Sequence, residues 1–139
     1  VMKEKGVSEE EINKRTSRAN QAFPDALVQN YKGLIEQLKL PDADDRHVLA
    51  AAIKTNANLI VTNNIKDFPE DYLHSFGLSV KTADDFLTDL IDLNPDQALV
   101  AFREMVLNKK NPKQDEFVVL NLLRNAGLKD TANYLHALL

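Results

Sequence analysis

The feature that most constrains the fold is an alanine-rich segment leading directly into a short run of β-forming apolar residues. Residues 45–55 include Ala50-Ala51-Ala52, and we predict a helix there because alanine has the highest helix propensity. Its small side chains would let that helix approach a sheet closely. The following run, Leu59-Ile60-Val61, is typical of a strand buried on both faces of a parallel sheet. Since a helix leading into such a strand is half of a βαβ unit, the sequence predicts an α/β fold.

Composition narrows the class of protein. The chain has 139 residues, of which 44% are hydrophobic and 27% charged, as in an ordinary globular protein. It contains no cysteine, which excludes disulfides, thiolate metal sites and a cysteine nucleophile, and which suits a reducing compartment. No apolar run approaches the ~20 residues that span a bilayer. We therefore predict a cytoplasmic protein with no membrane partner.

The formal net charge of −4 is not that of a protein whose whole surface binds nucleic acid. A nuclease remains compatible with it, because bound cations would neutralise an acidic metal site. Phosphates would then need a local basic surface. Two groups are candidates: Lys3, Lys5, Lys14, Arg15 and Arg18, and further on Lys109, Lys110 and Lys113. The alternative, solvated helix faces, is the commoner explanation of such clusters.

Start and stop signals predict further elements up to residue 81. Ser8 and Glu11 have the spacing of a capping box, and Pro24 should end the helix that they open. Gly77 is a plausible helix terminator. We also predict an edge strand at residues 26–28 and a short helix at residues 34–38. A second short helix is predicted at residues 70–76 and a final short strand at residues 78–80.

Beyond Lys81 the sequence predicts helices alone. Thr82 and Asp85 resemble a capping box, and Asn94-Pro95 is a strong helix start. Two further helices are predicted, one between Pro112 and Gly127 and one over residues 130–139. The apolar faces are predicted to be Leu99, Phe102 and Val106 in one helix, and Phe117, Leu120 and Leu123 in the next. We accordingly predict two domains, residues 1–81 and 82–139.

Polar residues surround the predicted helix and strand of the α/β part. Aspartates precede the helix, and Thr62, Asn64 and Asp67 follow the strand. Consecutive elements of an α/β unit are usually neighbours, so the two groups could converge. Mg²⁺ and Mn²⁺ prefer such oxygen ligands. The residues alone leave another explanation open, because aspartates before a helix are ordinary caps and Asn63-Asn64 is an ordinary turn.

Three short motifs resemble those of PIN domains, the fold of many metal-dependent ribonucleases, including VapC-type toxins of toxin–antitoxin pairs. Asp45-Arg-His-Val-Leu-Ala50 is similar to the family's acid-opened helix, and Thr62-Asn63-Asn64 to the end of its next strand. Lys66-Asp67-Phe68-Pro69 is similar to the sequence that follows. The resemblance covers residues 8–86, and residues 87–139 look like the small helical C-terminal domain of this branch.

The resemblance implies roles for individual residues. Asp45 would be a ligand of Mg²⁺ or Mn²⁺, Asn64 would take the fourth position of the site, and Asp67 could restore the carboxylate that Asn64 lacks. Asp44 and Thr62 would support the site, while Arg46 and His47 would contact RNA.

The resemblance also implies what is missing. A PIN domain begins with a strand that ends in its first catalytic aspartate, and a second acid follows. Residues 1–23 look like the helix after that second acid, so the expected α/β domain has an incomplete PIN-like sheet. We therefore expect a toxin endoribonuclease that is inactive alone, with RNA and an antitoxin as partners. A homodimer or a separate N-terminal chain could complete it. The alternative is a non-catalytic interaction or dimerisation module.

Overall fold

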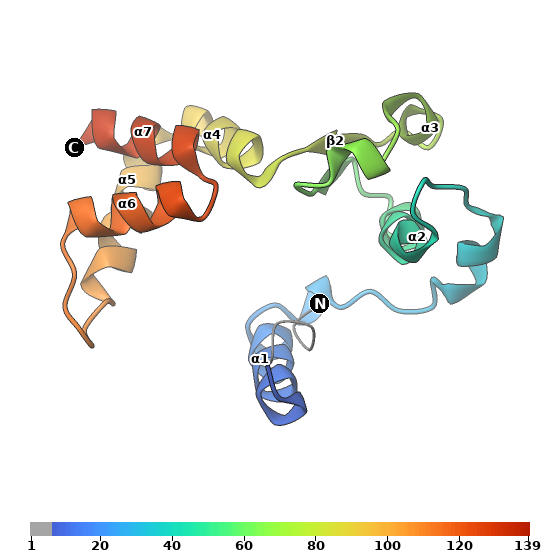
Figure 1. Ribbon diagram of the computed structural model, residues 1–139, viewed down its shortest axis with the longest axis horizontal. Helices are drawn as coiled ribbons and strands as arrows, with labels where there is room; N and C mark the ends of the chain where they lie inside the picture. Colours follow the sequence, from blue (N-terminus) through green and yellow to red (C-terminus); the bar gives the residue numbers. More distant parts are fainter. Residues whose placement is uncertain (1–6) are drawn as a thin grey trace. The chain divides into compact units, whose positions relative to one another are not determined.

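The computed structural model describes residues 7–139, and the predicted basic residues Lys3 and Lys5 lie outside them. The chain falls into two compact units, one ending at Ala57 and the other comprising Asn58–Leu139 (Figure 1). Among the described residues, no helix is both long enough and apolar enough to cross a membrane.

The first unit opens with α1 (Glu9–Ala22), whose N-terminus is capped as predicted. The Glu11 backbone N–H donates to Ser8 Oγ over 3.2 Å, and the helix ends before Pro24. The predicted edge strand at residues 26–28 is wrong. The chain instead forms a 3₁₀ turn, η2 (Pro24–Ala26), closed by a hydrogen bond from the Ala26 N–H to the Phe23 carbonyl. The fixed φ of Pro24 favours a helical turn, and three apolar residues cannot form a strand without a neighbour to pair with.

The rest of the first unit is built around the alanine-rich helix. Two 3₁₀ turns, η3 (Lys32–Gln37) and η4 (Ala43–Asp45), lead into α2 (Arg46–Lys54), and α2 packs against η3. The predicted helix at residues 45–55 is thus confirmed to within one residue at each end. The buried apolar side chains of this unit are Leu38, Leu49, Ala50 and Ala52.

The second unit begins with a small parallel sheet. Strands β1 (Leu59–Val61) and β2 (Ser79–Lys81) pair in register, Leu59 opposite Ser79. They are connected by η5 (Ile65–Asp67) and α3 (Glu70–His74), and Gly77, with φ of +73°, follows the end of α3. The α/β prediction is therefore confirmed. Val61, however, is 42% exposed while Ile60 is buried, so β1 is not covered on both faces within the described structure.

Four helices complete the second unit, as the sequence predicts: α4 (Ala83–Leu93), α5 (Pro95–Leu107), α6 (Glu116–Asn125) and α7 (Lys129–Leu138). Thr82 Oγ1 caps α4 and Asn94 Oδ1 caps α5, each accepting a backbone hydrogen bond three residues on. Helix α7 packs against the other three, and Figure 1 shows it beside α4 and α6. Their shared core consists of Ile91, Phe102, Val106, Val119, Leu120, Ala132 and Leu135. The domain boundary between residues 81 and 82 stays a prediction.

The predicted apolar face of α6 is only partly correct. Leu120 is fully buried and Leu123 packs against the core, but Phe117 is 57% exposed. Successive helical residues are rotated by about 100°, which places Phe117 roughly 160° from Val119 and roughly 120° from Leu123 around the helix. Its ring instead meets the His136 ring edge to face, with centroids 5.6 Å apart.

A carboxylate on α4 ties that helix to the start of α7. Asp84 Oδ1 accepts hydrogen bonds from the backbone N–H and the hydroxyl of Thr131, at 2.7 and 2.6 Å, and Asp84 Oδ2 accepts one from the Asp130 N–H at 2.9 Å. Partial burial alone would raise the pKa of Asp84, but these hydrogen bonds to its ionised form hold the pKa below the ordinary value of 3.8. Asp84 therefore caps α7 from a distant part of the sequence, because α7 has no side-chain cap of its own.

We expect Asp84→Asn to lower the free energy of unfolding by about 2 kcal/mol at neutral pH, through loss of the charged cap. The matched control is Asp85→Asn, one residue on, because the exposed Asp85 carboxylate takes no part in the contact with α7. Urea denaturation followed by circular dichroism measures both. The folded pKa of Asp84 is depressed, so the difference in free energy of unfolding between wild type and Asp84→Asn should have its full size at pH values well above 3.8. The difference should vanish as the pH falls through the folded pKa. A difference that persisted undiminished into strong acid would contradict this assignment.

Candidate functional site

The loop before α2 uses one of its three aspartates as a cap. Asp42 Oδ1 accepts a hydrogen bond from the Asp44 N–H at 2.9 Å and so caps η4. The Asp44 carbonyl lies 2.6 Å from His47 Nδ1. Because a carbonyl oxygen can only accept, His47 carries its proton on Nδ1, and in the neutral ring Nε2 is then an acceptor. The capping alternative accounts for Asp42.

Asp45 is placed differently. It occupies the N-cap position of α2, yet its side chain makes no capping hydrogen bond to that helix. The residue is half-buried, and its Oδ2 atom has less than 1 Å² of accessible surface. A negative charge here still interacts favourably with the helix dipole. Helix capping, the main structural alternative for this residue, does not explain the position of its carboxylate.

Arg46 is held against the same loop. Its Nε donates a 3.0 Å hydrogen bond to the Ala43 carbonyl, and the side chain is half-buried. The guanidinium thus braces η4, which leaves its terminal amino groups for any contact with a ligand.

The loop after β1 gathers the other predicted residues at the carboxyl end of the strand. The Thr62 N–H donates to the Lys81 carbonyl, which continues the β1–β2 ladder. Thr62 Oγ1 accepts a hydrogen bond from the Asn64 N–H at 3.1 Å, and the Asn64 carbonyl accepts one from the Asp67 N–H at 2.9 Å. The carboxyl ends of strands are where open α/β sheets place their ligands. The structure therefore brings Thr62, Asn64 and Asp67 into one tight turn at such an end.

The donor set can be compared with what a metal ion requires. Carboxylate and amide oxygens are the ligands that Mg²⁺ and Mn²⁺ prefer, so the donor chemistry of both loops fits these ions. Asp45 belongs to the first unit, whereas Asn64 and Asp67 belong to the second. Within the described residues, no group of three or more histidine and acidic side chains is close enough to hold an ion. The described residues thus supply oxygen ligands suited to Mg²⁺ or Mn²⁺, but fewer of them than such an ion requires.

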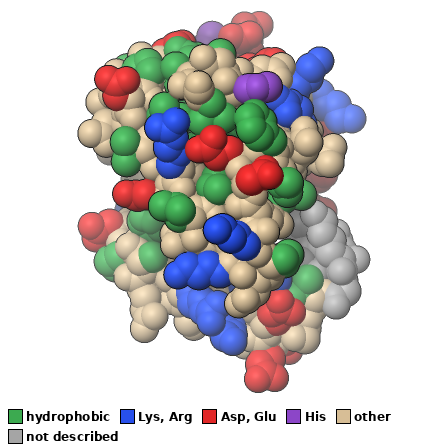
Figure 2. Space-filling view, turned by 90° about the vertical axis from the view of Figure 1, so that its left-hand side faces the viewer, with side chains coloured by type: hydrophobic (Ala, Val, Ile, Leu, Met, Phe, Trp, Pro, Cys, Tyr) green, Lys and Arg blue, Asp and Glu red, His purple; other side chains and the backbone are tan. Residues whose placement is uncertain are grey.

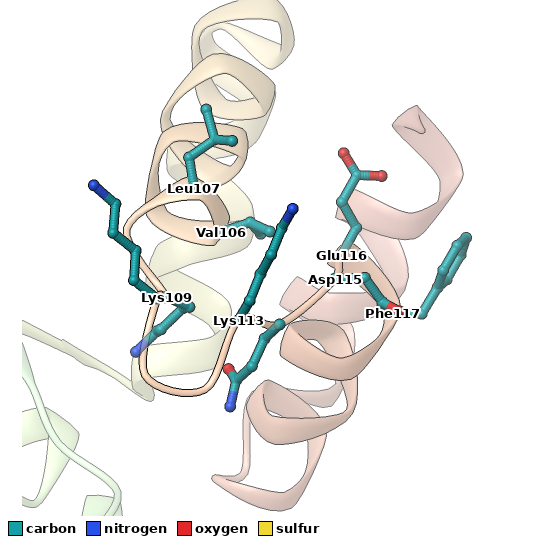
Figure 3. A pocket seen from close by; sticks show the side chains of 9 residues that line it. Val106, Leu107, Lys109, Lys113, Asp115, Glu116 and Phe117 are labelled. Carbon is teal, nitrogen blue, oxygen red and sulfur yellow. The ribbon is translucent and has the colours of Figure 1, made fainter.

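A separate feature of the second unit is an open cleft of about 840 Å³ at the loop joining α5 to α6 (Figure 3). Its lining includes Lys109, Lys110 and Lys113, together with Gln114 and Phe117. The sequence indicated the lysines as a candidate phosphate surface. It did not indicate Gln114 or the exposed Phe117, because Phe117 falls at the edge of an apolar helical stripe and was assigned to the core.

Comparison with known proteins first defines the class of the C-terminal helices. The family model of the VapC50 C-terminal domain matches residues 83–137, which are α4 to α7. A curated protein of Mycobacterium tuberculosis (strain ATCC 25618 / H37Rv), named "Putative ribonuclease VapC50", is 51% identical to this chain over 49 residues. The match covers 35% of this chain and 29% of that protein, so the chain spans less than a third of its relative. The comparison with solved structures found no match. The two matches confirm the resemblance to VapC-like PIN proteins that carry a C-terminal domain.

The hydrogen bond within the β1 turn gives a local test. We expect Thr62→Val, which removes the acceptor for the Asn64 N–H, to speed hydrogen exchange at the Asn64 amide about fivefold, the equivalent of about 1 kcal/mol. Thr62→Ser keeps the hydroxyl and serves as the control. Amide exchange followed by NMR measures both variants, with the Ile60 amide as an internal reference in β1. Equal exchange at Asn64 in the valine and serine variants would show that Thr62 does not order the turn.

Proposed function

We propose that this chain is part of a VapC-type endoribonuclease of the PIN family, the toxin component of a toxin–antitoxin pair, which hydrolyses RNA with the help of Mg²⁺ or Mn²⁺. Two independent features of one sequence support the proposal. The motifs at Asp45 and Asn64 resemble those of PIN domains, and residues 83–137 match a domain named after a VapC protein. The structural observation that carries the proposal is the Asp45 carboxylate, which stands at the start of α2 without capping it.

In this proposal Asp45 holds the divalent cation, with the Asn64 amide oxygen and the Asp67 carboxylate as further oxygen donors. When bound, the cation would activate a water molecule and stabilise the leaving oxygen of the phosphodiester. Thr62 Oγ1 accepts a hydrogen bond from the Asn64 backbone N–H and so orders the turn that carries Asn64. The Asp44 backbone carbonyl accepts a hydrogen bond from Nδ1 of His47. This would leave Nε2 of His47 to accept a hydrogen bond from a ribose hydroxyl. The terminal amino groups of Arg46 would pair with a phosphate.

The described residues would form only part of the catalytic site. Asn64 brings no negative charge, and a nuclease site needs several carboxylates to hold a divalent cation. We propose that further acids come from another segment or another chain, either a second copy or a complementing N-terminal chain. The polypeptide alone should then be inactive or nearly so. The partner of such a toxin would be an antitoxin protein that covers the site. The toxin would act in the cytoplasm, where RNA is made and translated.

Asp45→Asn tests the proposal through metal binding as well as activity. Mn²⁺ relaxes nearby nuclei, so titration of the labelled chain should broaden the NMR signals of residues 44–47 and 62–67. We expect Asp45→Asn to abolish the broadening at residues 44–47. Asp42→Asn, which alters a capping aspartate of the same loop, should leave it intact. Any cleavage of a labelled RNA in Mn²⁺ should fall at least 100-fold in Asp45→Asn and persist in Asp42→Asn, as expected for loss of a metal ligand. Mn²⁺ that broadened neither loop would refute the proposed site.

A second candidate function is a non-catalytic interaction module. The observation that favours it is the small sheet: within the described structure β1 pairs with β2 alone, and Val61 is 42% exposed. A strand edge with unsatisfied backbone groups is a template for pairing with another chain.

Light scattering over a wide concentration range discriminates the two candidates. The interaction module predicts a concentration-dependent dimer whose formation is unaffected by Asp45→Asn. A monomer at every concentration would dispose of self-association through this edge.

A further inference from the structure

Backbone hydrogen bonds close the loop between α5 and α6 into a defined turn. The Lys109 N–H donates to the Val106 carbonyl at 3.0 Å, and the Gln114 N–H donates back across the loop to the Lys109 carbonyl at 3.3 Å. Lys110 and Lys113 face each other in an antiparallel bridge. These contacts close the loop on itself, so the three lysines project from a defined turn beside the cleft of about 840 Å³.

The two acids that also line this cleft compensate its positive charge only in part. The Asp115 carboxylate accepts a hydrogen bond from the Val118 N–H at 2.9 Å and so caps α6. Glu116 Oε1 pairs with Arg103 Nε at 3.3 Å. By contrast, none of the ion pairs found among residues 7–139 includes Lys109, Lys110 or Lys113. The cleft therefore carries a local excess of positive charge in a chain whose net charge is −4.

The arrangement of the lysines fits an extended polyanion better than a single anion. Figure 3 shows the Lys109 and Lys113 side chains on opposite sides of the end of α5, with Lys113 reaching into the space between α5 and α6. Figure 2 shows several Lys and Arg side chains close together in the lower half of one face, with acidic side chains around them. Ammonium groups that diverge in this way can meet successive phosphates along a strand.

Two further groups in the same cleft suit a nucleic acid rather than an acidic peptide. Phe117 is 57% exposed, and its edge-to-face contact with His136 leaves ring surface open for stacking. Exposed aromatic rings beside basic residues are how proteins bind single strands, whose unstacked bases are available. Gln114 Oε1 is buried and has no hydrogen-bond partner among the described residues. The Gln114 side chain also lines the cleft, and an amide group can both donate to and accept from a base edge or a ribose hydroxyl.

We propose that this cleft, lined by Lys109, Lys110, Lys113, Gln114 and Phe117, is a single-stranded RNA-binding site. The lysines contact successive phosphates and Phe117 stacks on a base, so the C-terminal helices hold the strand that the α/β part is proposed to cleave. The choice of RNA as ligand rests on the proposed function. The site itself stands on the cleft, its charge and its exposed aromatic ring.

Fluorescence anisotropy of a labelled 12-nucleotide single-stranded RNA, in EDTA and with the full chain, tests this site without any cleavage. We expect the triple variant Lys109→Gln, Lys110→Gln, Lys113→Gln to weaken binding at least tenfold in low salt. Its slope of log affinity against log salt should be shallower by about 2, since each phosphate contact on a single strand contributes about 0.7. Phe117→Ala should weaken binding about tenfold with the salt slope unchanged, as loss of a stacked base predicts.

The control variant removes the same charge elsewhere. Lys32→Gln, Lys54→Gln, Lys129→Gln has the same net charge as the test variant but leaves the cleft intact, so its affinity should stay near that of wild type. Equal weakening in the two triple variants would overturn the site and indicate attraction by overall charge. Displacement of the RNA by polyglutamate at equal charge concentration would also overturn the site, because it would indicate a surface that binds acidic protein segments. The anisotropy assay in EDTA requires no metal site, and the Mn²⁺ titration requires no RNA, so failure of the nuclease proposal and failure of this site are distinguishable.

Discussion

The hydrogen bonds from the start of α7 to Asp84 are the interaction on which the helical part of the chain depends. Three donors on Asp130 and Thr131 converge on one carboxylate 46 and 47 residues earlier in the sequence. They fix the first turn of α7 against α4, and Thr131, although polar, is thereby buried without loss of hydrogen bonding. Ala132 and Leu135 follow in the same helix and carry the core shared with α5 and α6. A second polar contact, from the Tyr134 hydroxyl to Asp92 at 2.5 Å, holds the same pair of helices further along.

What the sequence predicted well was local chemistry. Ser8, Thr82 and Asn94 each cap a helix by accepting a hydrogen bond from the backbone three residues on, as their spacing indicated. The errors arose where the outcome depends on distant partners. Residues 26–28 have the side chains of a strand but no neighbouring strand in the structure, and Phe117 has the spacing of a core residue but lies beyond the edge of the buried stripe. Asp84 was not singled out, because nothing near it in sequence indicates that it caps α7.

The candidate catalytic residues followed from motifs, and the structure adds what motifs cannot. The sequence could not separate a capping aspartate from a functional one. In the structure Asp42 caps η4, whereas the Asp45 side chain makes no capping hydrogen bond to α2. It also supplies the bond from the Asn64 N–H to Thr62 Oγ1, which only the turn geometry after β1 could reveal. Whether the two loops form one site depends on long-range packing, which residue spacing does not encode.

The distribution of charge is compatible with the proposed binding of RNA by an acidic chain. A net charge of −4 gives no overall attraction for a polyanion. At physiological ionic strength, however, exposed charges more than about 8 Å apart are largely screened from one another. Lys109, Lys110 and Lys113, which join none of the ion pairs among residues 7–139, can therefore attract phosphates even though the chain as a whole is acidic. The residues proposed as metal ligands lie in other segments of the chain, at the start of α2 and after β1. In the proposed function, this separation of the two kinds of charge along the sequence would let the basic loop hold the strand while the acidic loops stay available for a cation.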